Sequence, residues 1–250
     1  MLLPALAFIY GLFIGSFLNV CIYRLPAGES IVTPPSHCPN CGRRLGAREL
    51  LPVVSFLWQR GRCRGCGSAI AWRYTLVELA TAILFAVLAW RFGWPDILWQ
   101  AAFYAVLVVI FFIDLDHQLI PDQLVLLLLG ITVLVLVLER GVPWGTALLG
   151  GLVGFGLFLL LAVLSSGGMG GGDIKLAAVL GLWFGWPQLL LVMFLSFLGG
   201  GLVGGALLLL KLKNRKDGIA FGPFLVLAAF IVSMWGNQLI TWYLRIAGFI

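Results

Sequence analysis

Long apolar runs separated by short polar stretches dominate this sequence. A helix needs about 20 apolar residues to cross a bilayer, and several runs have that length. They predict helices at Leu3–Tyr23, Thr75–Trp90, Ile97–Ile113, Gln123–Leu138, Trp144–Leu164, Ile174–Trp186, Leu189–Leu210 and Phe224–Ile246. Apolar and polar residues do not alternate in them, which argues against a transmembrane β-barrel. The pattern therefore predicts an all-α polytopic membrane protein with about eight transmembrane helices.

Small residues and one turn signal refine these predicted helices. The pair Trp186-Pro187 predicts a turn or kink after the run that starts at Ile174. Glycines gather in two helices, and their absent side chains let helices approach closely, so we expect tight packing there. These glycines are Gly150, Gly151, Gly154, Gly156, Gly199, Gly200, Gly201, Gly204 and Gly205.

The composition agrees with a membrane protein. The chain is 62% hydrophobic and 10% charged, whereas about 25% of the residues in a soluble domain are charged. The net charge of +6 does not indicate nucleic-acid binding, because the basic residues cluster between apolar runs. No Lys or Arg precedes Arg24. The first run is therefore expected to be a membrane helix with an outside N-terminus rather than a cleaved signal peptide.

The basic residues predict the topology. Lys and Arg are enriched in cytoplasmic loops, and here most of them fall on alternate connections. Only Arg91, Arg140 and Arg245 fall elsewhere. The cytoplasmic set is Arg24, Arg43, Arg44, Arg48, Arg60, Arg62, Arg64, Arg73, Lys175, Lys211, Lys213, Arg215 and Lys216. Both termini are then expected outside.

Two aspartates stand out within this topology. Asp114 ends a long apolar run, and Asp173 follows the glycine-rich stretch Gly167–Gly172. A carboxylate at membrane depth costs on the order of 2.5–3.5 kcal/mol on insertion scales, so it suggests a functional site. The predicted topology places both at the cytoplasmic edge. They can therefore share one site.

The longest polar stretch, residues 26–74, carries four cysteines in two C-x-x-C pairs, Cys38/Cys41 and Cys63/Cys66. This spacing is typical of a zinc ribbon, in which each pair offers two thiolates to one tetrahedral metal. Two disulfides are the alternative, but the reducing cytoplasm disfavours them. Four thiolates leave no open coordination position, so the predicted zinc is structural. The result is a small cytoplasmic zinc-ribbon-like insert.

Two neighbouring side chains are expected to play no part in this metal site. His37 precedes the first cysteine and is a weaker candidate than the four thiolates. Cys21 lies inside the first predicted helix, where a buried thiol usually serves packing.

Two facing carboxylates have a specific chemistry. Since like charges that share a site resist ionising together, one is protonated and the other is ionised. The ionised group takes a proton from water while the protonated one polarises a carbonyl, as in aspartic proteases. The glycines before Asp173 would let an extended ligand approach the backbone closely. If Asp114 and Asp173 face one another, the predicted reaction is peptide hydrolysis at a membrane surface.

More ordinary roles are also open to these acids. Asp122 follows Pro121 at the start of a predicted helix, where the helix dipole favours an acid, and Asp173 also opens a helix. Asp116 is two positions from Asp114, so a helix would point it to a different side. The glycines before Asp173 would then be a plain connector.

Further motifs occur in order along the chain. They are Gly15–Pro26, Leu51–Ser55, Arg60–Cys63 within the four-cysteine insert, Arg73–Glu78, Asp114 with Ile120-Pro121-Asp122, Gly170–Leu176 with the pattern G-x-G-D, and Phe221–Phe224. Together they resemble the type IV prepilin peptidases, also called leader peptidase/N-methyltransferases, which are G-x-G-D intramembrane aspartyl proteases. The resemblance covers nearly the whole chain.

The resemblance implies a function and its components. Asp114 and Asp173 would cleave the leader of a type IV prepilin or pseudopilin, from pilus or type II secretion systems, after a glycine on the cytoplasmic side. The new N-terminus would then be methylated with S-adenosylmethionine, whose binding residues the sequence does not identify. The zinc ligands would be Cys38, Cys41, Cys63 and Cys66. The location would be the bacterial inner membrane.

The resemblance also implies three regions. Residues 1–25 would form the first transmembrane helix, 26–74 the zinc-binding insert, and 75–250 the peptidase core. Anionic lipid headgroups are expected to contact the basic loops. The sequence does not define the oligomeric state.

Two other functions remain open on the sequence. A peptidase without methyltransferase activity would use the insert only to hold its loops together. A transporter would use membrane-edge carboxylates to bind protons or cations.

Overall fold

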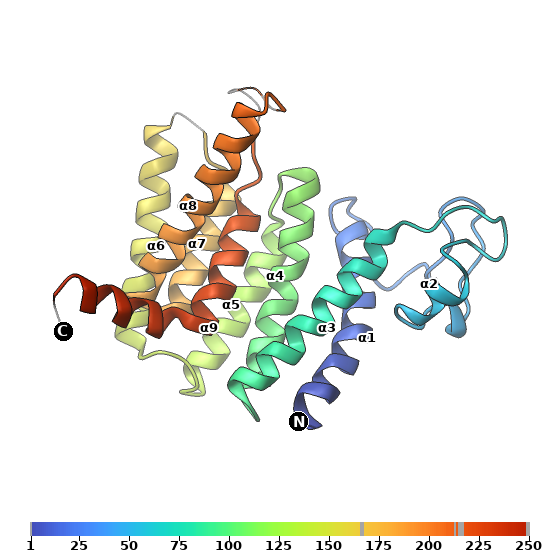
Figure 1. Ribbon diagram of the computed structural model, residues 1–250, viewed down its shortest axis with the longest axis horizontal. Helices are drawn as coiled ribbons and strands as arrows, with labels where there is room; N and C mark the ends of the chain where they lie inside the picture. The colour runs from blue at the N-terminus through green and yellow to red at the C-terminus, as the bar shows by residue number, and fades with distance from the viewer. Residues whose placement is uncertain (1, 166–167, 213, 215–217, 249–250) are drawn as a thin grey trace. The chain divides into compact units, whose positions relative to one another are not determined.

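The computed structural model describes residues 2–165, 168–212, 214 and 218–248. Gly167 and three of the basic residues used for the topology, Lys213, Arg215 and Lys216, lie outside these ranges. The elements in chain order are α1 (Leu2–Arg24), the 3-10 helix η1 (Ala47–Glu49), α2 (Val54–Trp58), α3 (Trp72–Phe92), α4 (Ile97–His117), α5 (Asp122–Val137), α6 (Trp144–Leu164), α7 (Gly171–Phe184), α8 (Gln188–Leu209) and α9 (Gly222–Ile246) (Figure 1).

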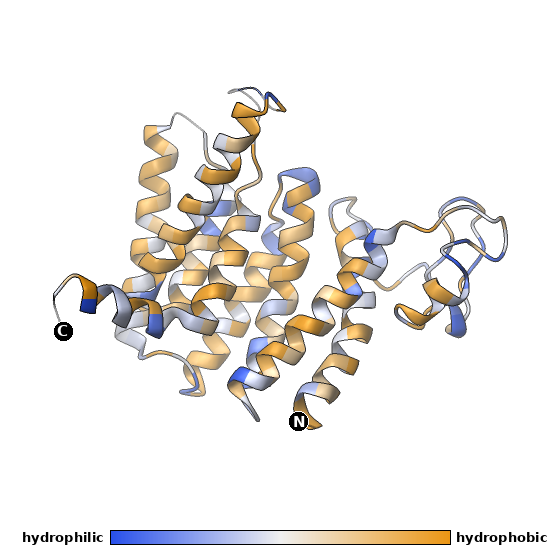
Figure 2. Ribbon diagram, in the orientation of Figure 1, coloured by the Kyte–Doolittle hydropathy of each residue, from blue (hydrophilic) through white to orange (hydrophobic). Residues whose placement is uncertain are grey.

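The prediction of an all-α membrane protein is confirmed. Each predicted apolar run lies on a helix, and the described ranges hold no strand beyond two isolated β-bridges. Within the part of the chain that the structure describes, six helices are long and apolar enough to cross a membrane: α1, α3, α4, α6, α8 and α9. Figure 2 shows these helices as largely hydrophobic and the loops of the insert as more hydrophilic. The chain is a multi-pass membrane protein.

The other two apolar helices have about their predicted lengths, but they are shorter than a helix that crosses the whole hydrocarbon core of a bilayer. α5 has 16 residues and α7 has 14, which at 1.5 Å per residue is about 24 and 21 Å, against a hydrocarbon core of about 30 Å. α5 starts after Pro121, and α7 ends where Gly185 adopts φ 67°. α5 begins at Asp122 of the Ile120-Pro121-Asp122 motif, and α7 begins at Gly171 of the G-x-G-D motif.

The chain divides into two compact units, with the boundary between Val109 and Ile110 inside α4. In the first unit α1 packs along α3. Two glycines of α1 bring the helices into backbone contact. A Cβ at Gly11 would lie 2.6 Å from Cα of Ala82, and one at Gly15 would lie 2.7 Å from Cα of Glu78. The polar insert connects these two helices.

The second unit is built around α7, which contacts α5, α6, α8 and α9. The expected glycine packing is seen where α6 meets α7. A Cβ at Gly150 would lie 2.3 Å from the carbonyl oxygen of Gly181, and one at Gly154 would lie 2.5 Å from that of Ala177. Since these glycines are four residues apart, they share one face of α6.

Some glycines do not serve this packing. A Cβ at Gly156 would meet no described atom within 4 Å, because a residue two positions beyond Gly154 faces another side of the helix. Gly201 and Gly205 in α8 are likewise open, whereas Gly199 and Gly200 lie against the rings of Phe224 and Phe221. The small-residue prediction thus holds for part of each cluster.

Candidate functional site

Asp114 lies in the last turns of α4, which continues past the predicted end at Ile113 to His117. Its side chain is buried, with 4% of its surface exposed. The backbone N–H of Gly222, at the start of α9, donates a 2.8 Å hydrogen bond to Oδ2 of Asp114. A Cβ at Gly222 would lie only 2.7 Å from the same oxygen. Only glycine therefore lets α9 approach this carboxylate so closely.

Asp173 lies in the first turn of α7. Its backbone N–H donates to the carbonyl oxygen of Gly170, and its Oδ2 lies 3.2 Å from the position of a Cβ at that glycine. Its Oδ1 is buried and has no hydrogen-bond partner among the described residues. A buried carboxylate oxygen without a partner is costly, which is typical of a group whose partner is a substrate or water.

The fold brings the two aspartates into one site. Their carboxylates interact electrostatically, and the side chain of Ile120 lies close to one glycine beside each of them. A Cβ at Gly172, next to Asp173, would lie 2.8 Å from Cβ of Ile120. A Cβ at Gly222 would lie 3.3 Å from Cδ1 of the same side chain. Ile120 is buried and packs against both glycines.

This arrangement changes the interpretation of the glycine stretch. The space beside Gly172 is filled by Ile120 and that beside Gly170 by the Asp173 carboxylate. A Cβ at Gly171 would meet no described atom within 4 Å. Close approach of a ligand backbone is therefore left to Gly171, while its neighbours accommodate this chain's own side chains.

The other two acids lie outside the aspartate pair. Asp122 opens α5, and its Oδ1 accepts a 2.7 Å hydrogen bond from Nζ of Lys175 on α7. Both side chains are more than half exposed, so this ion pair adds little to stability. Asp116 is exposed near the end of α4. The Asp122–Lys175 ion pair joins the start of α5 to the first turns of α7.

The four cysteines of the insert form a second candidate site. Their sulfur atoms all lie within 4.8 Å of one another, and the Sγ atoms of Cys38 and Cys66 are 3.9 Å apart. Four sulfurs that bind one zinc at 2.3 Å are about 3.8 Å apart in a tetrahedron. All four cysteines are free thiols. The donor set and its spacing therefore fit a single tetrahedral metal ion.

The two halves of this cluster have the same backbone design. The N–H of Cys38 donates to the carbonyl of Arg43, and the N–H of Cys63 donates to that of Ser68. The glycine after each pair, Gly42 or Gly67, donates back to the first cysteine of its half. These glycines have φ of 70° and 72°, a conformation that glycine adopts without strain. Each C-x-x-C pair thus forms its own tight turn.

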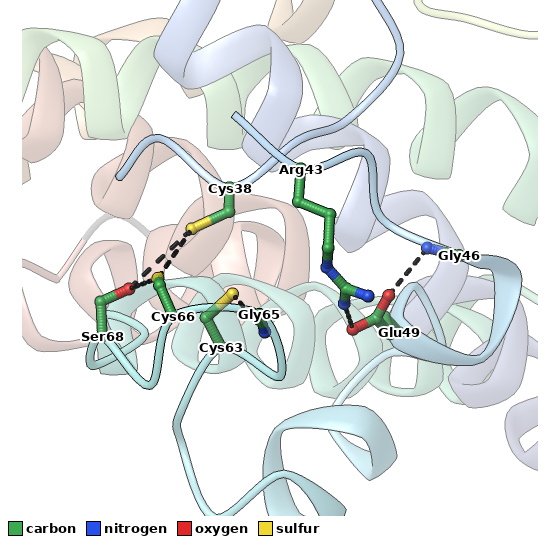
Figure 3. Close-up of polar contacts among 8 residues, drawn as sticks. All are labelled: Cys38, Arg43, Gly46, Glu49, Cys63, Gly65, Cys66 and Ser68. Carbon is green, nitrogen blue, oxygen red and sulfur yellow. Dashed lines mark hydrogen bonds and ion pairs between the residues drawn. The ribbon is translucent and has the colours of Figure 1, made fainter. Parts of the chain in front are cut away.

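Local hydrogen bonds order the cluster and favour the thiolate forms of two of its cysteines, Cys38 and Cys66 (Figure 3). The Ser68 hydroxyl, 3.1 Å from Sγ of Cys66, lowers the pKa of that thiol to about 6. The backbone N–H groups of Cys41 and Asn40 lower the pKa of Cys38. The Glu49 carboxylate, bound by the Gly46 N–H at 2.9 Å, forms an ion pair with Arg43. These contacts order the loop behind the first cysteine pair.

The two excluded side chains lie outside the cluster. His37 is not in the metal-binding group, and its Nδ1 lies 3.1 Å from the carbonyl oxygen of Pro35. Cys21 is buried in α1.

Two segments of the chain match models of known protein families. The first part of the chain, residues 9–92, matches the family model for the bacterial peptidase A24 N-terminal domain. Residues 101–205 match the model of the type IV leader peptidase family. Relatives described as prepilin leader peptidase/N-methyltransferase align over nearly the full length. One from Aeromonas salmonicida is 39% identical over 96% of this chain and 93% of its own length.

The chain belongs to the type IV leader peptidase family. Other relatives with the same description come from Pseudomonas aeruginosa, 38% identical over 96% of this chain and 92% of that protein, and from Bacillus subtilis, 35% identical over 97% and 98%. No solved structure is a significant match. Both aspartates lie within the leader peptidase match and all four insert cysteines within the N-terminal one.

Two residues that contact the candidate aspartate site were not predicted from the sequence to belong to it. Gly222 lies in the motif Phe221–Phe224, and Ile120 lies in the motif that ends at Asp122. Neither residue has a polar or ionisable side chain, so the residue types alone do not indicate a functional site. Their positions within recognised motifs were the only indication in the sequence. A motif does not show which carboxylate its residues contact.

Proposed function

We propose that this chain cleaves the leader peptides of type IV prepilins or pseudopilins and N-methylates the new N-terminal residue. The observation that supports this most directly is the near full-length identity to leader peptidase/N-methyltransferases. The pairing of Asp114 with Asp173 adds a chemical basis for the first activity.

The proposed hydrolysis uses the two aspartates as a coupled pair. The ionised carboxylate takes a proton from a water molecule, whose oxygen attacks the scissile carbonyl carbon. The protonated carboxyl donates a hydrogen bond to the carbonyl oxygen and stabilises its developing charge. The C–N bond then breaks, and the leaving amine takes a proton from the pair. The Gly222 N–H holds Asp114 in place through these steps.

The four insert cysteines would hold one structural zinc ion. Its chemistry is to tie the two C-x-x-C turns together, since four thiolates leave no position for a substrate. An insert of this size buries little apolar surface, and metal binding supplies folding free energy in such cases. S-adenosylmethionine would supply the methyl group for the second activity. The motifs of this chain do not identify the residues that bind this methyl donor.

Location and regions follow from the same proposal. The basic connections would face the cytoplasm of the bacterial inner membrane and contact anionic lipid headgroups. The active site would then open to the cytoplasm. By function, residues 1–25 would be the first transmembrane helix, 26–74 the zinc-binding insert and 75–250 the peptidase core.

The test is an intact-mass assay. The protein, purified in detergent with its zinc, is incubated with a prepilin and S-adenosylmethionine. We expect loss of the leader, followed by a mass gain of one methylene group on the mature pilin. Cleavage without this gain in pilin mass would show that the protein is a peptidase without methyltransferase activity. Asp114→Ala and Asp173→Ala should each abolish cleavage, and full cleavage by both variants would reject the aspartate mechanism.

A further inference from the structure

Glu78 is a buried acid that the proposed hydrolysis does not use. It lies in α3, one of the helices apolar enough to cross a membrane, and 8% of its surface is exposed. The aspartate pair and its neighbours Gly222 and Ile120 all belong to the second compact unit, whereas Glu78 belongs to the first. A carboxylate in such a helix is costly unless it has a specific partner.

The partner of Glu78 is the backbone of the zinc-binding insert. Its Oε2 accepts a 2.8 Å hydrogen bond from the N–H of Val53, which lies 25 positions earlier. The Ser16 hydroxyl of α1 also hydrogen-bonds to the carboxylate. Glu78 therefore connects three segments: its own helix, α1 and the loop that precedes α2.

The Val53 backbone has an uncommon conformation. Its φ is 61° and its ψ is −51°, and the N–H of Val54 donates back to the carbonyl of Pro52. This is a γ-turn of the rare kind with positive φ. A β-branched residue is strained there, and such strain persists only where surrounding contacts enforce it. The Glu78 hydrogen bond is a contact of that kind.

The helix pair beneath this turn is tightly held. A Cβ at Gly15 of α1 would lie 2.7 Å from Cα of Glu78, so the two backbones touch at this level. Near the ends of the insert, the Asn19 amide donates to the carbonyl of Tyr74 at 3.0 Å, and Arg24 donates to that of Ser30 at 2.8 Å. The α1–α3 pair thus offers a fixed platform for the insert.

We propose that Glu78 is a positioning residue that docks the zinc-binding insert on the α1–α3 pair through the Val53 turn, and that N-methylation requires this docking whereas leader cleavage does not. The second part rests on the proposed function. The described aspartate pair lies wholly in the second unit, so loss of docking in the first unit is expected to leave the pair in place. Our proposal assigns the methyl transfer named in the relatives to groups of the first unit. An insert that swings freely would still bind zinc but would not hold those groups in place.

The experiment compares four variants of the full zinc-loaded protein. Glu78→Ala removes the acceptor, and Glu78→Gln keeps an uncharged oxygen that accepts the same N–H. Val53→Gly keeps the N–H and relieves the positive-φ strain. Thr81→Val is the matched control, since the hydroxyl of this buried residue donates a hydrogen bond within its own helix α3, to the Val77 carbonyl. The measurements are amide hydrogen exchange at residue 53, zinc content, leader cleavage, and methylation of a pre-cleaved pilin.

We expect exchange at residue 53 to be about tenfold faster in Glu78→Ala, because a hydrogen bond to a charged group is lost. Methylation should fall about tenfold, while cleavage and zinc content stay at the wild-type level. Glu78→Gln should be intermediate in exchange and methylation. Val53→Gly and Thr81→Val should match the wild type in both activities.

Unchanged exchange in both Glu78 variants would overturn the docking contact. Faster exchange with full methylation would overturn its role in methyl transfer, and equal loss of cleavage would overturn the selectivity. If Glu78→Ala does not fold, Glu78→Gln carries the same comparison. If the wild type cleaves but never methylates, the proposed second activity fails, and the exchange data still decide whether Glu78 docks the insert.

Discussion

The backbone N–H of Gly222 donates a hydrogen bond to the carboxylate of Asp114 across 108 positions of sequence. This contact requires glycine, because a Cβ at position 222 would lie 2.7 Å from Oδ2 of Asp114. The start of α9 therefore positions one carboxylate of the candidate active site. The same glycine also lies against Ile120, whose side chain packs against Gly172 beside Asp173 as well.

Substitution of this glycine should impair cleavage. In Gly222→Ala the new methyl group displaces the Asp114 carboxylate, and small misplacement of a catalytic group costs about a hundredfold in rate. We expect kcat/KM for prepilin cleavage to fall by that factor in a mass-based assay. Gly201→Ala is the control, since a Cβ there meets no described atom within 4 Å. Wild-type cleavage by Gly222→Ala would show that this contact does not position Asp114.

Loss of either aspartate of the pair should nearly abolish cleavage. Asp114→Asn and Asp173→Asn should each lose about a thousandfold in cleavage, because an amide supplies neither the acid nor the base. Methylation of a pre-cleaved pilin should continue in both variants. That second measurement separates lost chemistry from lost folding, and parallel loss of both activities would point to misfolding instead.

The neighbouring acids should tolerate the same change. Asp122→Asn breaks only the exposed ion pair with Lys175, which should alter the free energy of unfolding by less than about 1 kcal/mol. Asp116→Asn removes an exposed carboxylate near the end of α4. Both variants should keep most of their cleavage activity. A loss as deep as that of Asp114→Asn in either one would assign that acid to the catalytic pair.

The insert should bind one zinc ion per chain. Cys63→Ser removes one of the four sulfurs, so metal content measured by mass spectrometry should drop and the insert should become sensitive to protease. Cys21→Ala should keep its zinc, because that thiol is buried in α1 outside the cluster. Equal zinc content in the two variants would contradict a four-thiolate site.

The glycine contact between α6 and α7 should be important for stability. A Cβ at Gly181 would lie 2.2 Å from the carbonyl oxygen of Gly150, so Gly181→Ala forces the helices apart. We expect a loss of about 3 kcal/mol, the upper range for overpacking, seen as a lower unfolding temperature in detergent. Gly156→Ala is the matched control and should be neutral or stabilising, since that position is open. Equal stability of both variants would contradict this packing.

The sequence alone predicted those structural features that are set by residues close to one another in the chain. Apolar runs long enough to cross a bilayer form helices whatever their partners, because backbone groups in lipid must be satisfied within the segment. The two C-x-x-C pairs form the same local turn, since each turn closes through hydrogen bonds within six residues. The helix start at Asp122 and the end of α7 before Trp186-Pro187 follow from local turn chemistry in the same way.

Contacts between distant segments needed the tertiary structure. Nothing local to Gly222 shows that its N–H reaches Asp114, and nothing local to Ile120 shows that it lies between Gly172 and Gly222. The sequence by itself determined the apolar helices, the four-thiol cluster and the two candidate aspartates. Only the tertiary structure decided which backbone groups hold them, because such contacts depend on how helices far apart in the chain pack against one another.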